Sequence, residues 1–277
     1  MTSVLVIGLT GQVGEALLPR LLARFGAIDA LSRYPRDPAP GVHWLPGSLE
    51  AMPPETANSH DLLISLGPLD AFADWYASAL PSARRIVALG SMGRNDKADS
   101  PDAHERNLAT RLADAEEILL GTGSRDGAAV TVLRPTLLYG NGRDRTLTPL
   151  VALARRWRVV PIPASARGLR QPVHVDDVAT AILDCIDAPA ASNQAFDLPG
   201  GEALGFDSMV RRTVQRHAPG AVVVALPAIV VRAATSLGSW LGRPSLSGSL
   251  ARLSQDQSAD LLPAQLAFAY RPGPFRP

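Results

Sequence analysis

The sequence predicts an α/β fold in which one main core, built on a parallel sheet, carries a smaller appended lobe. The length of 277 residues is only slightly more than one α/β domain uses. Short apolar runs alternate with helical patterns through the first two thirds of the chain, which is typical of βαβ units. Hydrophobic residues at 46% and charged residues at 19% argue against a disordered or fibrous chain.

The predicted strands are unbroken runs of valine, isoleucine and leucine. Such runs are typical of parallel strands that helices cover on both faces. We expect strands at residues 4–7, 28–31, 42–45, 62–65, 86–89 and 130–133.

Leucines at helical spacing predict the helices between these strands. The first stripe comprises Leu17, Leu18, Leu21 and Leu22, and we expect a kink at the enclosed Pro19. A second helix is expected over residues 105–120.

The pattern changes after residue 141. It predicts a helix at 148–156, a strand at 159–163 and a helix at 178–186 that Asp176 or Asp177 caps. Further helices are expected after Asp207 and Pro227, and residues 237–241, Phe268 and Tyr270 are expected to pack on the smaller lobe.

Charge and cysteine content exclude several classes of function. With 27 basic and 26 acidic residues, the net charge of +1 gives no general attraction to nucleic acid or to an anionic membrane. Cys185 is the only cysteine, which excludes an internal disulfide and suits a reducing cytoplasm. The five histidines show no metal-ligand spacing, so no metal is expected. We also expect neither a signal peptide nor a membrane span, and hence a soluble cytoplasmic protein.

A glycine loop follows the first predicted strand and opens the first predicted helix. Gly8, Gly11 and Gly14 are spaced three residues apart. A dinucleotide site needs such residues for a tight turn, for close approach of the backbone to a pyrophosphate and for close helix–strand contact. A purely structural turn is the alternative.

The end of the second predicted strand favours NADP(H) over NAD(H). Ser32 and Arg33 stand there, where an acidic residue would bind a ribose 2′-hydroxyl and a basic one a 2′-phosphate. Arg33 could instead be a solvated surface residue with Asp29 in the acidic role, although Asp29 lies early in the strand. The cofactor contacts that we expect are Gly8, Thr10, Gly11, Gln12, Val13, Gly14, Ser32, Arg33, Leu66, Gly67 and Pro135.

Three motifs, in order, resemble the extended or atypical branch of the short-chain dehydrogenase/reductase superfamily, the NAD-dependent epimerase/dehydratase family. They are the glycine loop, the Leu133-Arg134-Pro135 segment that leads to Tyr139-Gly140, and residues 170–179, RQPVHVDDVA. The resemblance implies a doubly wound Rossmann sheet with a smaller C-terminal substrate lobe. We expect residues 1–143 and 171–187 in the Rossmann domain, and 144–170 and 188–277 in the substrate lobe.

The sequence departs from the family at the proton-transfer residues. The family uses a Tyr-x-x-x-Lys pair, but the single lysine, Lys97, is preceded four residues earlier by Gly93. Aligning the helix at 105–120 puts Leu108 and Leu112 where the tyrosine and lysine would stand, and neither can transfer a proton. The usual hydroxyl position falls on Met92, next to Ser91.

Three functions remain open at this point. The first is an NADP(H)-dependent oxidoreductase or epimerase-like enzyme that uses other groups, with Ser91, Tyr139 and His174 as catalytic candidates. The second is a non-catalytic dinucleotide sensor or assembly factor that acts through protein contacts. The third is a structural protein with an empty glycine loop.

Arginines near the predicted cleft favour a small, anionic substrate. The resemblance implies that Arg170 contacts a substrate phosphate, and Arg143 follows Tyr139, a further candidate substrate contact, at the same mouth. A solvated loop is the alternative for these arginines. The resemblance also allows a homodimer.

Overall fold

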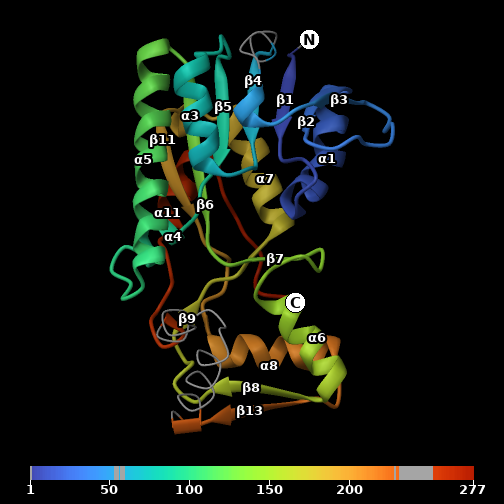
Figure 1. Cartoon of the computed structure of the whole chain (residues 1–277), viewed down its shortest axis with the longest axis vertical. Helices are drawn as coiled ribbons and strands as arrows, with labels where there is room; N and C mark the ends of the chain where they lie inside the picture. Colours follow the sequence, from blue (N-terminus) through green and yellow to red (C-terminus); the bar gives the residue numbers. More distant parts are fainter. Residues whose placement is uncertain (1, 53–55, 57–59, 228, 231–251) are drawn as a thin grey trace.

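A seven-stranded, wholly parallel sheet forms the centre of the computed structural model, which describes residues 2–52, 56, 60–227, 229–230 and 252–277 (Figure 1). Its strand order is β11-β6-β5-β4-β1-β2-β3, so the order reverses beside β1, as in doubly wound folds. The strands are β1 (Val4–Ile7), β2 (Ile28–Ser32), β3 (Val42–Pro46), β4 (Leu62–Ser65), β5 (Arg85–Leu89), β6 (Ala129–Pro135) and β11 (Gln194–Leu198).

Alternate residues of the central strands enter two separate hydrophobic clusters, one on each face of the sheet. On β1, Val4 and Val6 belong to one cluster, whereas Leu5 and Ile7 belong to the other. Helices α1 (Gln12–Phe25), α7 (Val175–Ile186) and α11 (Leu262–Phe268) supply the first cluster. Helices α3 (Leu69–Ala79) and α5 (Ala103–Asp126) supply the second. Burial on both faces is why these strands lack polar alternation.

The predicted strands and long helices are confirmed, with boundaries that shift by a few residues. Helix α1 is continuous through Pro19. Helix α7 begins at Val175, three residues before its predicted start, and neither predicted aspartate is its N-cap. The cap is His174, whose ring Nδ1 accepts a hydrogen bond from the backbone N–H of Asp176 at 3.2 Å.

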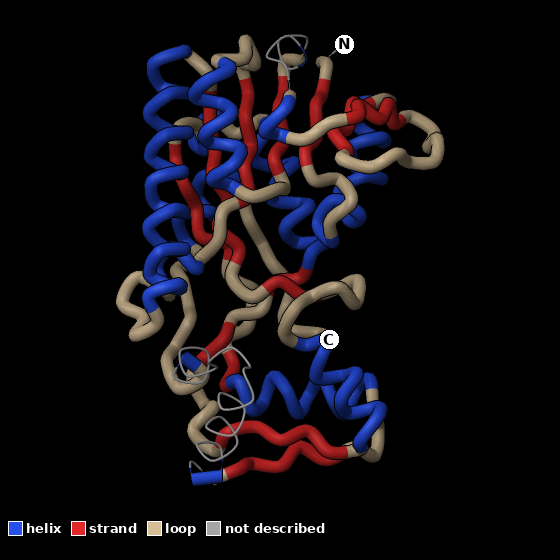
Figure 2. Tube along the Cα trace, in the orientation of Figure 1, coloured by secondary structure: helices blue, strands red, loops and turns tan. Residues whose placement is uncertain are grey.

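The smaller lobe lies beneath the carboxyl ends of the strands and has its own core (Figure 2). Helices α6 (Leu147–Trp157) and α8 (Phe206–His217) pack on a parallel strand pair, β8 (Val159–Pro163) and β13 (Val222–Leu226). The remaining short elements are β7 (Leu138–Tyr139), β9 (Leu169–Arg170), β10 (Val173–His174), β12 (Leu204–Gly205), α4 (Gly93–Asp96), η1 (Leu49–Ala51) and η2 (Pro189–Ala191).

The predicted boundary at residue 188 is wrong for two elements. Strand β11 pairs with β6 as an edge of the central sheet, and α11 packs on β11 and α7. Sequence alone did not place β11 in the sheet because its residues, QAFDL, do not form an unbroken apolar run.

The last aromatic residues join the two lobes. Phe268 packs edge-on against Phe196 of β11, with ring centroids 5.2 Å apart, and Tyr270 lies in the same cluster. Both therefore pack on the sheet. The prediction that they pack on the smaller lobe is wrong. Phe275, by contrast, is buried in the core of the smaller lobe. The predicted segment 237–241 lies outside the described residues.

Candidate functional site

Each glycine of the loop has a distinct structural reason. Gly8 has φ +81°, and a Cβ there would stand 3.0 Å from the backbone N of Gly67. Gly11 is the N-cap of α1 and forms no side-chain cap, and its N–H donates to the Gly8 carbonyl at 3.0 Å. Gly14 contacts the Leu9 backbone so closely that a Cβ would overlap it. The loop therefore forms the tight turn and the close contact that its spacing predicted.

A hollow of about 240 Å³ opens over this loop at the start of α1. The first N–H groups of a helix have no intrahelical partner and favour an anion such as a phosphate. Within the described part of the chain, the buried Oε1 of Gln12 accepts no hydrogen bond, so a bound group could satisfy it. The predicted cofactor residues that line the hollow are Gly8, Gly11, Gln12, Val13, Gly14, Leu66, Gly67 and Pro135.

Three predicted cofactor residues, Thr10, Ser32 and Arg33, lie outside this hollow. Arg33 is exposed at the end of β2, with its guanidinium carbon 6.0 Å from the Tyr34 ring centroid. Ser32 Oγ accepts a hydrogen bond from Nε of Arg36 at 3.3 Å. Arg36 is thus a second arginine at this strand end. The sequence did contain a signal for it, because Arg36 follows Arg33 by three residues.

Asp29 does not lie free at the nucleotide end of β2. Its carboxylate contacts His60 Nε2 at 2.6 Å and His43 Nδ1 at 3.0 Å. Both carboxylate oxygens of Asp29 are therefore engaged by histidine rings.

A larger cleft, of about 570 Å³, lies between the sheet and the smaller lobe. Gln12, Pro135 and Leu138 line both this cleft and the hollow over the glycine loop, so the two spaces are adjacent. Predicted residues Ser91 and Arg143 line the cleft, as do Asp96 and Lys97, which sequence reasoning had not assigned to a site. Arg143 is held at the mouth by the Glu15 carboxylate and by the Thr10 carbonyl, the latter at 3.0 Å.

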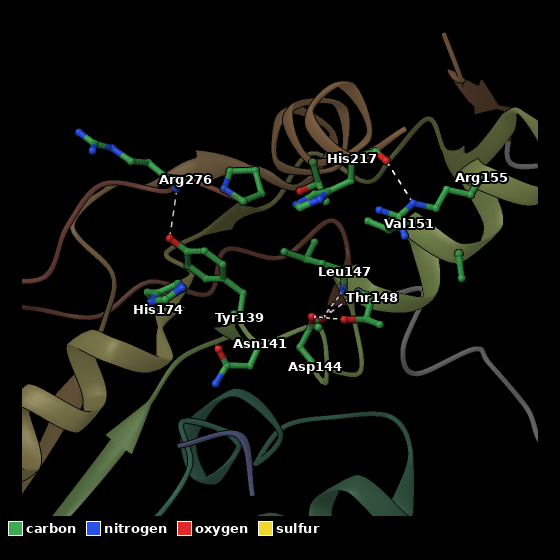
Figure 3. Close-up of a pocket in the computed structure, with 15 residues that line it drawn as sticks. Tyr139, Asn141, Asp144, Leu147, Thr148, Val151, Arg155, His174, His217 and Arg276 are labelled. Atoms are coloured by element: carbon green, nitrogen blue, oxygen red, sulfur yellow. Dashed lines mark hydrogen bonds between the residues drawn. The ribbon is translucent and has the colours of Figure 1, made fainter. Parts of the chain in front are cut away.

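Tyr139 and His174 line another cavity of about 430 Å³, formed with α6, α8 and the last residues, which shares Asp144 with the cleft (Figure 3). The Tyr139 hydroxyl accepts a hydrogen bond from the Arg276 N–H at 3.1 Å, and its ring meets His174 edge-on with centroids 5.0 Å apart. Burial raises the pKa of Tyr139, although the Arg276 N–H opposes the rise. Neither side chain lines the cleft of Ser91 or the glycine hollow. Ser91 therefore lines a different space from Tyr139 and His174, and the Nδ1 of His174 is used to cap α7.

Arg170, predicted to contact substrate, is 3% exposed and lines none of these three cavities. Its guanidinium donates to the carbonyls of Leu169 at 2.6 Å, Gln255 at 2.7 Å and Arg252 at 2.7 Å. Three backbone acceptors occupy its donors, so the structure gives Arg170 a structural role.

Helix α5 carries hydrophobic residues where the resemblance required a tyrosine and a lysine. Leu112 packs on the second sheet cluster and Leu108 is half-buried. Glu116, one turn later, is buried and pairs with Arg134 at 3.3 Å and Arg94 at 3.2 Å. Burial raises the pKa of Glu116, with Arg134 and then Arg94 opposing. This ion-pair group joins α5 to β6 beneath the cleft.

The sequence model of the NAD dependent epimerase/dehydratase family matches residues 93–198. This part of the chain is similar to that family. The matched residues contain Lys97, the Tyr139 and His174 motifs and strand β11.

Two individual proteins are similar to the chain in sequence. UDP-glucose 4-epimerase of Vibrio cholerae is 27% identical over 115 residues, which are 42% of this chain and 35% of that protein. The 3beta-hydroxysteroid-dehydrogenase/decarboxylase isoform 2 of Arabidopsis thaliana is 27% identical over 219 residues, or 73% of this chain and 38% of that protein. The chain thus spans little more than a third of the length of these relatives.

The fold extends over the whole chain. The solved structure of MoeE5 in complex with UDP-glucuronic acid and NAD has a TM-score of 0.73 at 17% identity, covering 99% of this chain and 94% of that one. This likeness confirms the predicted Rossmann architecture of the family.

Two further observations concern the part of the chain that the structure describes. No helix there is both long and apolar enough to cross a membrane. In the same residues, no group of three or more His, Cys, Asp or Glu side chains could hold a metal ion.

Proposed function

We propose that this chain is an NADP(H)-dependent oxidoreductase of the epimerase/dehydratase family that acts on a small molecule in the cleft between its lobes. The observation that supports this most directly is the adjacency of two spaces. The hollow over the glycine loop and the larger cleft share Gln12, Pro135 and Leu138 as lining residues. A dinucleotide with its pyrophosphate over α1 would then present its reactive end to the cleft.

Different residues of the chain would bind different parts of the dinucleotide. Gly8 and Gly11 form the tight turn, Gly14 brings α1 against Leu9, and the N–H groups at the start of α1 would bind the charge of the pyrophosphate. When bound, the nicotinamide supplies or accepts a hydride. Pro135 and Ser91 line the adjoining space where a substrate would lie. Related proteins include one whose solved structure contains NAD and a UDP-sugar, which supports this class of cofactor.

The preference for NADP(H) rests on Arg33 and Arg36. Both arginines belong to the loop after β2, and Arg36 Nε donates a hydrogen bond to Ser32 Oγ. Two arginines can bind a 2′-phosphate by charge-assisted hydrogen bonds, and the histidine-bound Asp29 offers no competing carboxylate there.

Calorimetric titration with NADPH and NADH tests both parts of the proposal. We expect NADPH to bind more tightly, and the double change Arg33→Ala and Arg36→Ala to weaken NADPH binding by about tenfold to 100-fold while NADH binding stays the same. Arg84→Ala, which removes an exposed cation at the other end of the sheet, is the matched control. Tighter NADH binding would overturn the NADP(H) preference, and failure of both dinucleotides to bind would overturn the whole proposal.

A non-catalytic sensor or assembly factor is the second candidate, favoured by Leu108 and Leu112 on α5. It predicts tight NADPH binding with no oxidation of NADPH by any member of a panel of carbonyl compounds. The proposed enzyme instead oxidises NADPH with at least one of them.

The proposal extends to the location and the assembly of the protein. We propose a cytoplasmic protein, in keeping with a single buried cysteine. A homodimer is the proposed assembly, and light scattering of the purified chain would show its mass directly.

A further inference from the structure

We infer that Ser91 and Lys97 form the carbonyl-binding and proton-donating pair of the cleft, and that their substrate is a carbonyl compound carrying an anionic group. The inference rests on the proposed function, since it needs a dinucleotide in the adjacent hollow. It assigns the proton-transfer role to residues of a different segment from α5.

Gly93 is the structural reason that the two side chains share one space. A Cβ on Gly93 would stand 3.2 Å from Ser91 Oγ, 3.5 Å from Lys97 Cδ and 3.6 Å from Lys97 Cε. The hydroxyl and the lysine stem therefore lie over the same bare Cα. Both residues line the cleft together with Pro135, which also borders the glycine hollow.

The Ser91 hydroxyl can donate a hydrogen bond to a ligand in the cleft. Its Oγ accepts from the Gly93 N–H at 3.1 Å, which occupies one lone pair and leaves the hydroxyl hydrogen free to turn to a ligand. A carbonyl oxygen in the cleft would be the natural acceptor.

Lys97 is placed to give up a proton. Among the residues that the structure describes, no carboxylate forms an ion pair with its ammonium group. Burial lowers the pKa of Lys97, and so does Arg252, whereas the neighbouring Asp96 opposes them. A lysine with a lowered pKa is a stronger acid than an exposed one.

The charges around the cleft select an anion. Asp96 and Asp144 are the acidic residues of its lining, and the Asp144 carboxylate is used by the first turn of α6, accepting from the N–H of Thr146 at 3.0 Å and of Thr148 at 3.2 Å. The cationic residues of the lining are Lys97, Arg143, Arg145 and Arg252. Glu15 pairs with Arg143 and Glu105 with Arg252, so Arg145, which is exposed, joins Lys97 as a cation with no ion pair in the described part of the chain.

The reaction balances with these groups. In the reductive direction the carbonyl carbon gains the hydride that the dinucleotide supplies, and the electron pair of the C=O π bond moves to oxygen. The Lys97 ammonium donates a proton to that oxygen, directly or through the Ser91 hydroxyl. Carbonyl, NADPH and one proton thus give alcohol and NADP⁺, and the lysine amine regains that proton from the solution.

The single lysine permits a test that does not depend on turnover. Pyridoxal 5′-phosphate is an anionic aldehyde that forms an imine with an amine, releasing water, and borohydride fixes the product. Because Lys97 is the only lysine in the 277 residues, peptide mass spectrometry separates its label from that of the terminal amine. We expect Lys97 to be labelled at neutral pH at least about tenfold faster in the folded chain than in urea, from its more acidic ammonium and the basic cleft. Labelling of the folded chain at the terminal amine alone, or no faster than in urea, would overturn the inference.

Kinetic measurements then show whether Lys97 donates a proton or only binds the anionic group of the substrate. With NADPH and 4-carboxybenzaldehyde as probe, we expect Lys97→Met and Lys97→Arg each to lower kcat by about 100-fold or more, because arginine keeps the charge but does not release a proton at these pH values. Unchanged kcat in Lys97→Arg would overturn the assignment. Arg84→Met is the matched control and should retain the rate of the unmodified chain.

Two further readouts distinguish this inference from the proposed function. The rate of the unmodified chain should fall as pH rises through the pKa of Lys97, and benzaldehyde, which lacks the anionic group, should react with a higher KM. NADPH binding is measured separately by fluorescence. If NADPH binds but 4-carboxybenzaldehyde does not oxidise it, the inference fails while the dinucleotide site stands. If NADPH does not bind, the proposed function fails first.

Discussion

Gly14 of α1 packs against the carbonyl group of Leu9 with no space for a side chain between them. The contact fixes the start of α1 relative to β1, and with it the position of the loop that borders the hollow. Gly14→Ala must displace backbone atoms, which costs about 1–3 kcal/mol of stability or more. We expect a lower urea midpoint together with weakened NADPH binding.

Gly121→Ala is the matched control for this change. Gly121 is exposed within α5, and nothing lies within 4 Å of a Cβ built there. Because alanine favours a helix more than glycine does, the variant should gain about 0.5–1 kcal/mol and bind NADPH normally. Equal effects from the two alanines would contradict the role assigned to Gly14.

Arg170 should matter for stability rather than for recognition. Arg170→Ala leaves the carbonyls of Leu169, Gln255 and Arg252 without their charged donor, so we expect a loss of about 2–4 kcal/mol in urea unfolding. The NADPH dissociation constant of the folded variant should not change. Arg167→Ala, at an exposed position nearby, should stay within about 0.5 kcal/mol of the unmodified chain.

Tyr76 links stability to alkaline pH. It is fully buried on α3, and within the described residues its hydroxyl has no hydrogen-bond partner. Burial, aided by Asp126, raises the pKa of Tyr76 to about 12, from about 10 in an unfolded chain. The unfolded chain therefore loses this proton first, and stability falls as pH rises from about 10 to 12.

Tyr76→Phe should remove this share of the alkaline destabilisation and, by deleting an unsatisfied hydroxyl, gain about 1 kcal/mol at neutral pH. Unfolding free energies measured at pH 8 and near pH 11 give both values. Tyr34→Phe, at a tyrosine with 67% exposure, serves as the control and should change neither. A slope with pH that is the same in Tyr76→Phe and the unmodified chain would refute the prediction.

Cys185 should report unfolding. The thiol is fully buried in α7 and donates to the Ile182 carbonyl at 3.2 Å, and burial raises the pKa of Cys185 to about 12. A thiol reagent such as dithionitrobenzoate should react with the folded chain at least about 100-fold more slowly than in urea. NADPH should slow the native reaction further if it binds only the folded chain. Rapid labelling without denaturant would show that α7 opens locally.

The sheet could be predicted because burial on both faces leaves unbroken apolar runs, and strands such as β1 and β4 lie where those runs stand. Strand β11 could not, because its sequence, QAFDL, alternates with polar residues at the edge of the sheet. The start of α7 was misplaced for a different reason. Histidine is an uncommon N-cap, whereas the aspartates that follow it are frequent caps.

The candidate site also has a part that the sequence predicts and a part that it does not. The glycine loop is a local motif, and its neighbours in sequence are also its neighbours in space. Tyr139 and Arg170 belong to recognisable motifs, but their partners are Arg276 for Tyr139 and residues 252 and 255 for Arg170, which come from far along the chain. Lys97 was set aside because it lacked a tyrosine four residues earlier, although the short helix α4 brings it beside Ser91.

The residues from Phe268 to Phe275 are anchored at both ends, Phe268 and Tyr270 under the sheet and Phe275 between the helices of the other lobe. Neither core can come apart without releasing an aromatic group held by the same short stretch of backbone. The molecule should therefore melt as one cooperative unit, with calorimetric and van't Hoff enthalpies that agree, rather than lobe by lobe.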